Sequence, residues 1–117
     1  MKLEHAISEL NVQLTRAEKW LRECDYILPT GVCAHDRELR WARRSGEFFL
    51  LVGPAKADMS LFRKLLAEGG AEALLWAAPV VPLLVEALEA NHEGLQSTLF
   101  KRSTDLYSYL DKKGAPR

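Results

Sequence analysis

The N-terminal segment carries the strongest pattern in the sequence, a run of apolar residues spaced alternately by four and by three positions. Its members are Leu3, Ile7, Leu10, Leu14, Ala17, Leu21 and Cys24. This spacing places them in one stripe along an α-helix and is typical of a seam that packs against another helix. Pro29, followed by Thr30 and Gly31, marks the end of the pattern. We therefore expect a helix over 1–28 that must bury one apolar face.

The C-terminal third predicts a second and longer helix, over 80–113. Pro82 suits the first turn of such a helix, and Lys112, Lys113 and Gly114 suit its end. Steps of four and three from Leu88 pass through His92, Leu95, Leu99, Arg102, Leu106 and Tyr109. The two polar residues on this seam either help to select a partner or mark where the helix face turns toward solvent. Because the second helix is longer than the first, the first cannot cover its whole length.

The middle of the chain predicts a β-hairpin over 37–53. Two β-capable runs are joined by Ser45-Gly46, and the second run stops at Gly53-Pro54. In the first run Leu39 and Trp41 share one face, because side chains alternate along a strand. A two-stranded ribbon alone is marginally stable in water, so this hairpin must pack on helices.

These elements define the expected fold class, which is α+β and mainly α. Residues 58–78 predict two short helices separated by Gly69-Gly70. We expect one domain over 1–117, in which the long C-terminal helix packs antiparallel to the first helix. A chain of 117 residues with 48% apolar and 27% charged residues has the size and composition of one folded domain.

Charge and hydropathy narrow the classes of partner. Sixteen basic residues balance 16 acidic ones, so no overall field draws the chain to nucleic acid or to an anionic membrane. The longest apolar run, 73–85, is shorter than the roughly 20 residues that span a bilayer. The first residues contain no apolar stretch typical of a signal peptide. We therefore expect a cytoplasmic protein without membrane contact, whose two cysteines stay reduced.

The sequence offers little for catalysis or for metal binding. Cys24, Cys33 and His35 could be imagined as zinc ligands or as a thiol with its base, but their spacing matches no established zinc pattern. Cys24 also completes the apolar seam, where a cysteine behaves as a small hydrophobic residue. No phosphate-binding loop, nucleophile elbow or metalloprotease motif is present. We expect no enzyme activity, no cofactor and no metal.

The hairpin supplies the first set of candidate contact residues, in which basic side chains alternate with aromatic ones. The set is Arg40, Trp41, Arg43, Arg44, Phe48 and Phe49. Basic residues beside aromatic ones are used to bind single-stranded nucleic acid, through backbone charge and base stacking. Asp36, Glu38 and Glu47 lie in the same hairpin and can pair with the arginines instead.

The two long helices supply the second set of candidates, which we expect in helix packing or in an oligomer interface. This set is Leu10, Leu14, Leu95, Leu99 and Leu106. The leading functional prediction is a non-enzymatic protein-interaction module that forms a homodimer or another homo-oligomer through these seams. It would act as a small adaptor, regulator or inhibitor of a larger protein. The alternative is a nucleic-acid-binding protein that uses the arginine-rich hairpin.

Overall fold

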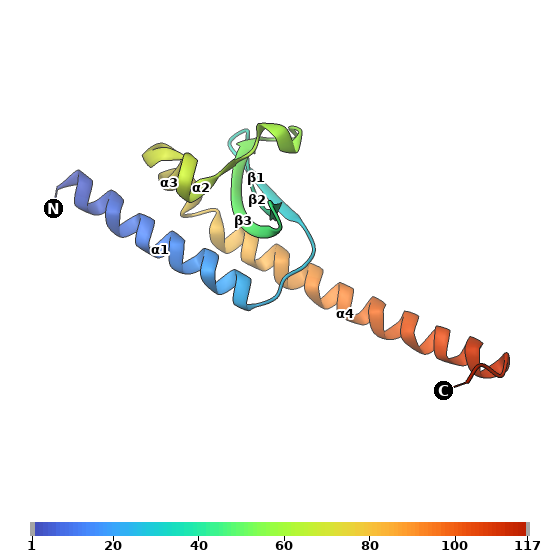
Figure 1. Ribbon diagram of the computed structural model, residues 1–117. Helices are drawn as coiled ribbons and strands as arrows, with labels where there is room; N and C mark the ends of the chain where they lie inside the picture. The colour runs from blue at the N-terminus through green and yellow to red at the C-terminus, as the bar shows by residue number, and fades with distance from the viewer. Residues whose placement is uncertain (1, 117) are drawn as a thin grey trace.

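The computed structural model describes residues 2–116 and confirms the expected α+β class, with 59% helix and 20% strand. Met1 and Arg117, which the expected ranges 1–28 and 1–117 include, lie outside the described residues. In chain order the elements are α1 (Leu3–Glu23), β1 (Thr30–Ala34), β2 (Arg37–Arg44), β3 (Glu47–Pro54), the 3-10 helix η1 (Met59–Leu61), β4 (Arg63–Lys64), α2 (Leu65–Glu68), α3 (Gly70–Ala77) and α4 (Val81–Lys112) (Figure 1).

The strands form one antiparallel sheet in the order β1-β2-β3-β4. The expected hairpin is present, with Arg44 paired to Glu47 across the turn at Ser45 and Gly46. Both turn residues have positive φ, 55° and 85°, which suits the right-handed twist of the strands that the turn joins.

The sheet is wider than the predicted two-stranded hairpin, because residues 30–34, for which the sequence predicted no strand, form β1. β1 pairs with β2 through a second two-residue turn, His35-Asp36, in which both residues have positive φ. That turn contains no glycine, so the usual hairpin signal is missing from the sequence.

Residues 58–68 also differ from the expected helix, because they form η1, β4 and the short α2. Phe62 is buried against the sheet face opposite the helices, in a cluster with Ala42 and Leu51. A Cβ added at Gly53 would lie 2.9 Å from the Phe62 ring, so glycine is needed there for this close packing. The contact with the sheet therefore overrides the local helical pattern of this segment.

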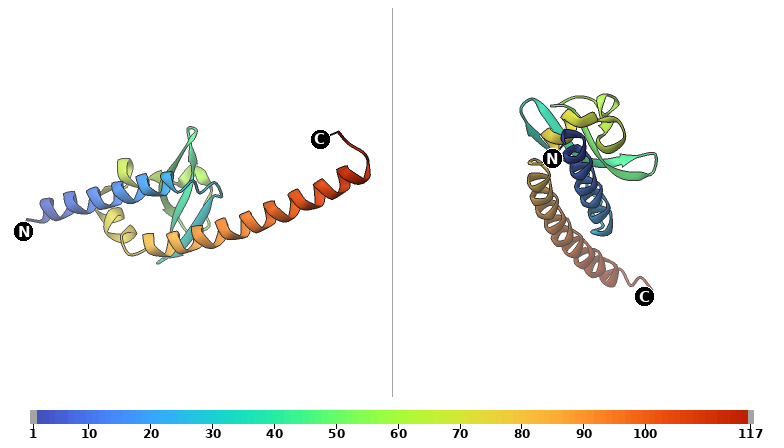
Figure 2. Two further views of the ribbon diagram at one scale, coloured as in Figure 1. Left: turned by 90° about the horizontal axis from the view of Figure 1, so that it is seen from below. Right: turned by 90° about the vertical axis from the view of Figure 1, so that its left-hand side faces the viewer.

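The main core lies between the other sheet face and the helices. Its buried residues come from every α-helix, from the two central strands and from the turn before α4: Leu14, Leu21, Leu39, Trp41, Leu50, Leu65, Ala73, Leu74, Ala77, Val80, Leu84 and Leu88. The helices thus cover one face of the sheet, as Figures 1 and 2 show. Leu39 and Trp41 both point into this core, as their shared face predicted.

Two polar side chains attach α1 to the edge of β3 at the end that β4 does not reach. Buried Glu18 accepts a hydrogen bond from the backbone N–H of Leu50 at 2.9 Å, and Arg22 donates to the carbonyl oxygen of Phe48 at 2.8 Å. Glu18 and Arg22 also form an ion pair at 3.2 Å. Backbone groups of β3 that have no partner in the sheet are therefore hydrogen-bonded by side chains of α1.

The two long helices run in the same general direction, which differs from the expected antiparallel pair (Figures 1 and 2). α1 packs mainly on α2, α3 and β3, whereas the first half of α4 packs on β1 and β2. Each helix buries its apolar face on the sheet and the short helices instead of on the other long helix. The first helix also ends at Glu23 rather than at 28, because Asp25 adopts a left-handed φ of 58°.

Among residues 2–116, no single helix is long and apolar enough to cross a membrane. The pair α3 and α4 passes the same test of length and composition together, with a bend of 59° between its members.

We predict that Glu18→Ala lowers the free energy of unfolding by about 1–3 kcal/mol, because it leaves the buried N–H of Leu50 without an acceptor. Glu18→Gln keeps an acceptor oxygen and should cost less. Urea denaturation followed by tryptophan fluorescence measures both changes. Glu9→Ala, at an exposed position of the same helix, is the matched control and should stay within about 0.5 kcal/mol of the parent. An equal loss in the control would contradict the assigned role of Glu18.

Candidate interaction surface

The second half of α4 leaves the body of the molecule as a single helix. We call residues 96–112 the arm. Every residue of the arm is exposed, whereas Leu84 and Leu88 in the first half of the same helix are fully buried. The arm gives the protein its elongated shape, 70 × 27 × 24 Å (Figures 1 and 2).

An apolar stripe runs along the arm on the same side of α4 that is buried in the body. The stripe consists of Leu95, Leu99, Leu106, Tyr109 and Leu110. These residues continue the helical spacing of Leu84 and Leu88, so the apolar face keeps its direction as it leaves the core. Leu99 and Leu106 each expose 57% of their surface, as does Tyr109. Of the two polar residues on this seam, His92 is half-buried against Tyr26 and Arg102 is exposed to solvent, so the selection of a partner by these residues stays a prediction.

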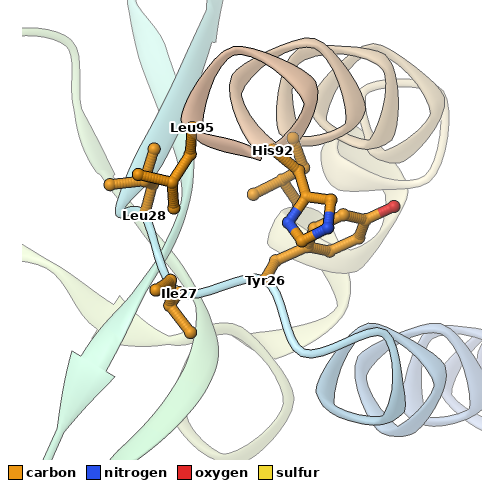
Figure 3. Close-up of a pocket in the computed structure, with 6 residues that line it drawn as sticks. Tyr26, Ile27, Leu28, His92 and Leu95 are labelled. Atoms are coloured by element: carbon orange, nitrogen blue, oxygen red, sulfur yellow. The ribbon is translucent and has the colours of Figure 1, made fainter. Parts of the chain in front are cut away.

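The root of the arm is held in place by polar and aromatic contacts. Asn91 donates a hydrogen bond to the hydroxyl of Thr30 at 2.9 Å, and that hydroxyl donates to the carbonyl oxygen of Leu28 at 3.0 Å. The rings of His92 and Tyr26 meet edge to face at 5.5 Å (Figure 3). The direction in which the arm leaves the body is therefore set by side chains of α4, β1 and the loop before it.

Tyr26 also ties this loop to the core, since its carbonyl oxygen accepts a hydrogen bond from the indole N–H of Trp41 at 3.3 Å. Burial raises the pKa of the Tyr26 hydroxyl, and the nearby Cys24 and Glu89 raise it further. The tyrosine therefore stays neutral at physiological pH.

The loop Tyr26–Leu28 lies against the stripe side of α4, where it lines a small hollow with Leu88, His92 and Leu95 (Figure 3). Ile27 and Leu28 remain 50% and 37% exposed beside that hollow. The exposed apolar surface therefore extends from the stripe onto the body. The sequence analysis did not single out these two residues; the available signal was an apolar pair outside the heptad spacing, just before Pro29.

Charge is distributed unevenly along α4. Its first half carries Glu86, Glu89 and Glu93, whereas the arm and the following residue carry Lys101, Arg102, Asp105, Asp111, Lys112 and Lys113. Lys112 lies in the last turn of α4, where a positive charge complements the helix dipole. Glu86 and Glu93 lie on the side of α4 opposite the stripe, so these carboxylates do not border it.

The helix-packing candidates divide into two groups. Leu14 is buried in the core, and Leu10 is half-buried against it. Leu95 is half-buried at the root of the arm, whereas Leu99 and Leu106 are exposed. From Ile7 to Cys24 the N-terminal seam is thus mostly an internal packing surface, although Leu3 is exposed, whereas the C-terminal seam is exposed beyond Leu95.

Most of the hairpin candidates are engaged within the chain. Trp41 is fully buried and stacks on Phe48, with the ring centroids 5.5 Å apart. The ring of Phe49 lies between two cations, with the Arg22 guanidinium 4.8 Å and the Lys64 ammonium 4.2 Å from its centroid. These aromatic rings are therefore largely covered by neighbouring side chains.

The arginines of the hairpin make structural contacts as well. Arg40 forms an ion pair with buried Glu38 at 2.6 Å, and Arg37 pairs with Glu72 of α3 at 2.7 Å. Arg44 donates to the carbonyl oxygens of Phe62 and Met59, the latter at 2.7 Å. Arg43 is exposed and lies over the ring of Phe48. The pairing of hairpin arginines with acidic residues that the sequence allowed is thus present for Arg40.

Cys24 and Cys33 are both free thiols, the first half-buried and the second exposed. Among residues 2–116, no group of three His, Cys, Asp or Glu side chains is arranged to hold a metal ion. His35 lies in the turn between β1 and β2.

No protein-family model, curated protein or solved structure matches the chain.

We predict that Arg44→Ala lowers the free energy of unfolding by about 1–3 kcal/mol, because two carbonyl oxygens of the segment over the sheet lose their donor. Arg43→Ala is the matched control from the same strand and should cost less than about 1 kcal/mol, since it loses only an exposed cation–π contact. Guanidinium denaturation measures both changes. Equal stabilities for the two variants would contradict the structural role of Arg44.

Proposed function

We propose that this protein is a non-enzymatic protein-interaction module that self-associates through the stripe of the arm. The observation that carries the proposal is the continuation of a buried apolar helix face into a fully exposed helix. Leu99 and Leu106 lie on the side of α4 that Leu84 and Leu88 use to pack in the core, yet each exposes 57% of its surface. A contiguous exposed apolar patch of this kind is typical of an interaction site.

The stability of the arm supports the same proposal. Helices in proteins owe most of their stability to tertiary packing of an apolar face, and isolated helices shorter than about 12–15 residues are marginal in water. The arm is only slightly longer than that limit. A second helix laid along the stripe would supply the missing packing, and the stem of Arg102 can lie along such an interface while its guanidinium reaches water.

A second copy of the chain is the partner that we propose, because each copy presents the same exposed apolar stripe and could cover that of the other. The body would then remain free to contact a larger protein, as an adaptor, regulator or inhibitor in the cytoplasm. The hairpin does not support the nucleic-acid alternative equally well, since Arg37, Arg40 and Arg44 are already engaged within the described chain.

We predict that the protein sediments as a dimer at tens of micromolar and that Leu99→Asp/Leu106→Asp converts it to a monomer. Two charges in the apolar interface would have to be desolvated on association, which is strongly unfavourable. Sedimentation equilibrium measures the change. The near-ultraviolet circular dichroism of buried Trp41 should persist in the variant, because neither leucine contributes to the core.

The matched control is Ser97→Asp/Thr104→Asp, which adds the same two charges to the opposite side of the arm. It should leave the dimer intact. A parent protein that remains monomeric at high micromolar concentration would refute the proposal. Equal dissociation in the control would show that added charge, and not loss of the stripe, causes the effect.

A further inference from the structure

We infer that the edge of β1 is a second contact surface, on which another copy of the chain pairs its own β1 antiparallel to this one. β1 is the outermost strand of the sheet on the side opposite β4. The pairing would join the sheets of two copies into one continuous sheet. The inference goes beyond the stripe of the arm and does not depend on it, because the contact is made by backbone hydrogen bonds and not by an apolar helix face.

The register of the first hairpin decides which backbone groups of β1 point away from the sheet. Residues 35–36 form a two-residue turn, so Ala34 and Arg37 on its two sides exchange hydrogen bonds. Along an antiparallel pair, positions that bond to the neighbouring strand alternate with positions that do not. Gly31 and Cys33 are therefore the residues of β1 whose N–H and C=O groups point outward.

No partner for these four groups lies within residues 2–116. Gly31 and Cys33 are both exposed, and no helix or loop of the described chain forms a hydrogen bond with their backbone. At the edge of β3, by contrast, α1 bonds the N–H of Leu50 and the carbonyl oxygen of Phe48. β1, with the sequence Thr-Gly-Val-Cys-Ala, also has neither the charged residues nor the proline that often protect an edge strand. This edge is open to another strand.

A second copy of β1 matches the edge in one antiparallel register, which is centred on Val32. Gly31 of each copy then lies opposite Cys33 of the other, and each such pair exchanges two hydrogen bonds. All four outward groups of both copies are bonded in this way. A register centred on Gly31 would instead place Cys33 opposite Pro29, whose nitrogen carries no hydrogen. The edge is thus self-complementary about a two-fold axis.

The side chains of β1 suit pairing with a copy of the same strand. Two-fold symmetry brings a charge on such a strand close to the like charge of the second copy, and β1 carries no charge. Gly31 and Cys33, which are small, face each other on one side of the sheet. On the other side Val32 meets Val32 of the second copy, at a position where antiparallel strands approach closely and β-branched side chains pack well.

A second copy is favoured over a flexible peptide because its strand is already ordered. The net contribution of a backbone hydrogen bond is comparable to the entropy cost of ordering one residue. A flexible peptide would therefore lose most of the gain from four bonds, whereas β1 is held in the sheet by β2 before it binds. Four bonds form a modest contact, so we expect the edge pair at protein concentrations above those at which the arms associate.

Disulfide trapping tests the register. Cys24 and Cys33 are replaced by serine, and one new cysteine is introduced by Val32→Cys. In the inferred pair the Cα atoms of residue 32 in the two copies lie about 4.5 Å apart, which a disulfide can bridge. Ala34→Cys in the same background is the matched control, because this position is also half-buried but lies roughly 14 Å from its counterpart. Oxidation at high protein concentration, followed by non-reducing electrophoresis, measures both rates.

We expect Val32→Cys to form the covalent dimer at least about ten-fold faster than Ala34→Cys, because only the first pair has disulfide geometry. Cys33→Pro, used in place of the serine, removes an outward N–H at a position where an edge strand tolerates proline. It should abolish the difference between the two cysteine positions. Equal rates at positions 32 and 34 with serine at position 33 would overturn the inference. Near-ultraviolet circular dichroism of Trp41 checks that each variant stays folded.

The variant Leu99→Asp/Leu106→Asp separates this inference from the proposed function. Selective trapping at position 32 should persist in that variant, although the arms no longer associate. A parent protein that sediments as a monomer but is trapped selectively at position 32 would refute association through the stripe and support the edge pair. Loss of selective trapping in the variant would overturn the edge pair as an independent contact and leave association through the stripe standing.

Discussion

The attachment of α1 to the sheet edge helps to position the loop after this helix and, through that loop, the arm. Glu18 and Arg22 satisfy the N–H of Leu50 and the carbonyl oxygen of Phe48 at the end of β3 that β4 leaves unpaired. Because α1 is held there, the chain leaves it beside the core, where the indole of Trp41 binds the carbonyl oxygen of Tyr26. The loop that begins at Tyr26 can then pack on α4 and fix the root of the arm. Side chains of α1 thus form the hydrogen bonds that this part of the edge of β3 lacks within the sheet. The position of α1 in turn determines where the following loop begins.

The same apolar face of α4 lies in two environments, the core of the body and the solvent. In its first half this face is buried on β1 and β2, and in the arm the same face meets solvent. The burial of Leu84 and Leu88 provides a rigid base for the exposed half, which the contacts of Asn91 and His92 reinforce. A partner that packs on the arm therefore meets a helix whose direction is already set. This reduces the conformational entropy that would be lost on association.

The accuracy of the sequence predictions depended on how local each signal was. The heptad spacing of α1, the Ser45-Gly46 turn and the long C-terminal helix rest on neighbouring residues, and the structure contains all three. β1 was not predicted because its turn contains no glycine and its partner strand supplies the hydrogen bonds. The helix expected from 58 is interrupted because Phe62 packs on the distant Gly53. For the candidate surface, the sequence identified Leu95, Leu99 and Leu106 but not Ile27 and Leu28, whose role depends on where the loop meets α4.

The sequence alone determined that the chain forms two long amphipathic helices around a hairpin, because periodicity and turn chemistry act over a few residues. Only the tertiary structure decided which of the apolar stripes is internal. The first helix and the start of the second bury their stripes on the sheet and the short helices, and they run in the same general direction. The sheet ends before α4 does, so the rest of the second stripe extends beyond the body, and the part of the chain that the structure describes leaves it exposed.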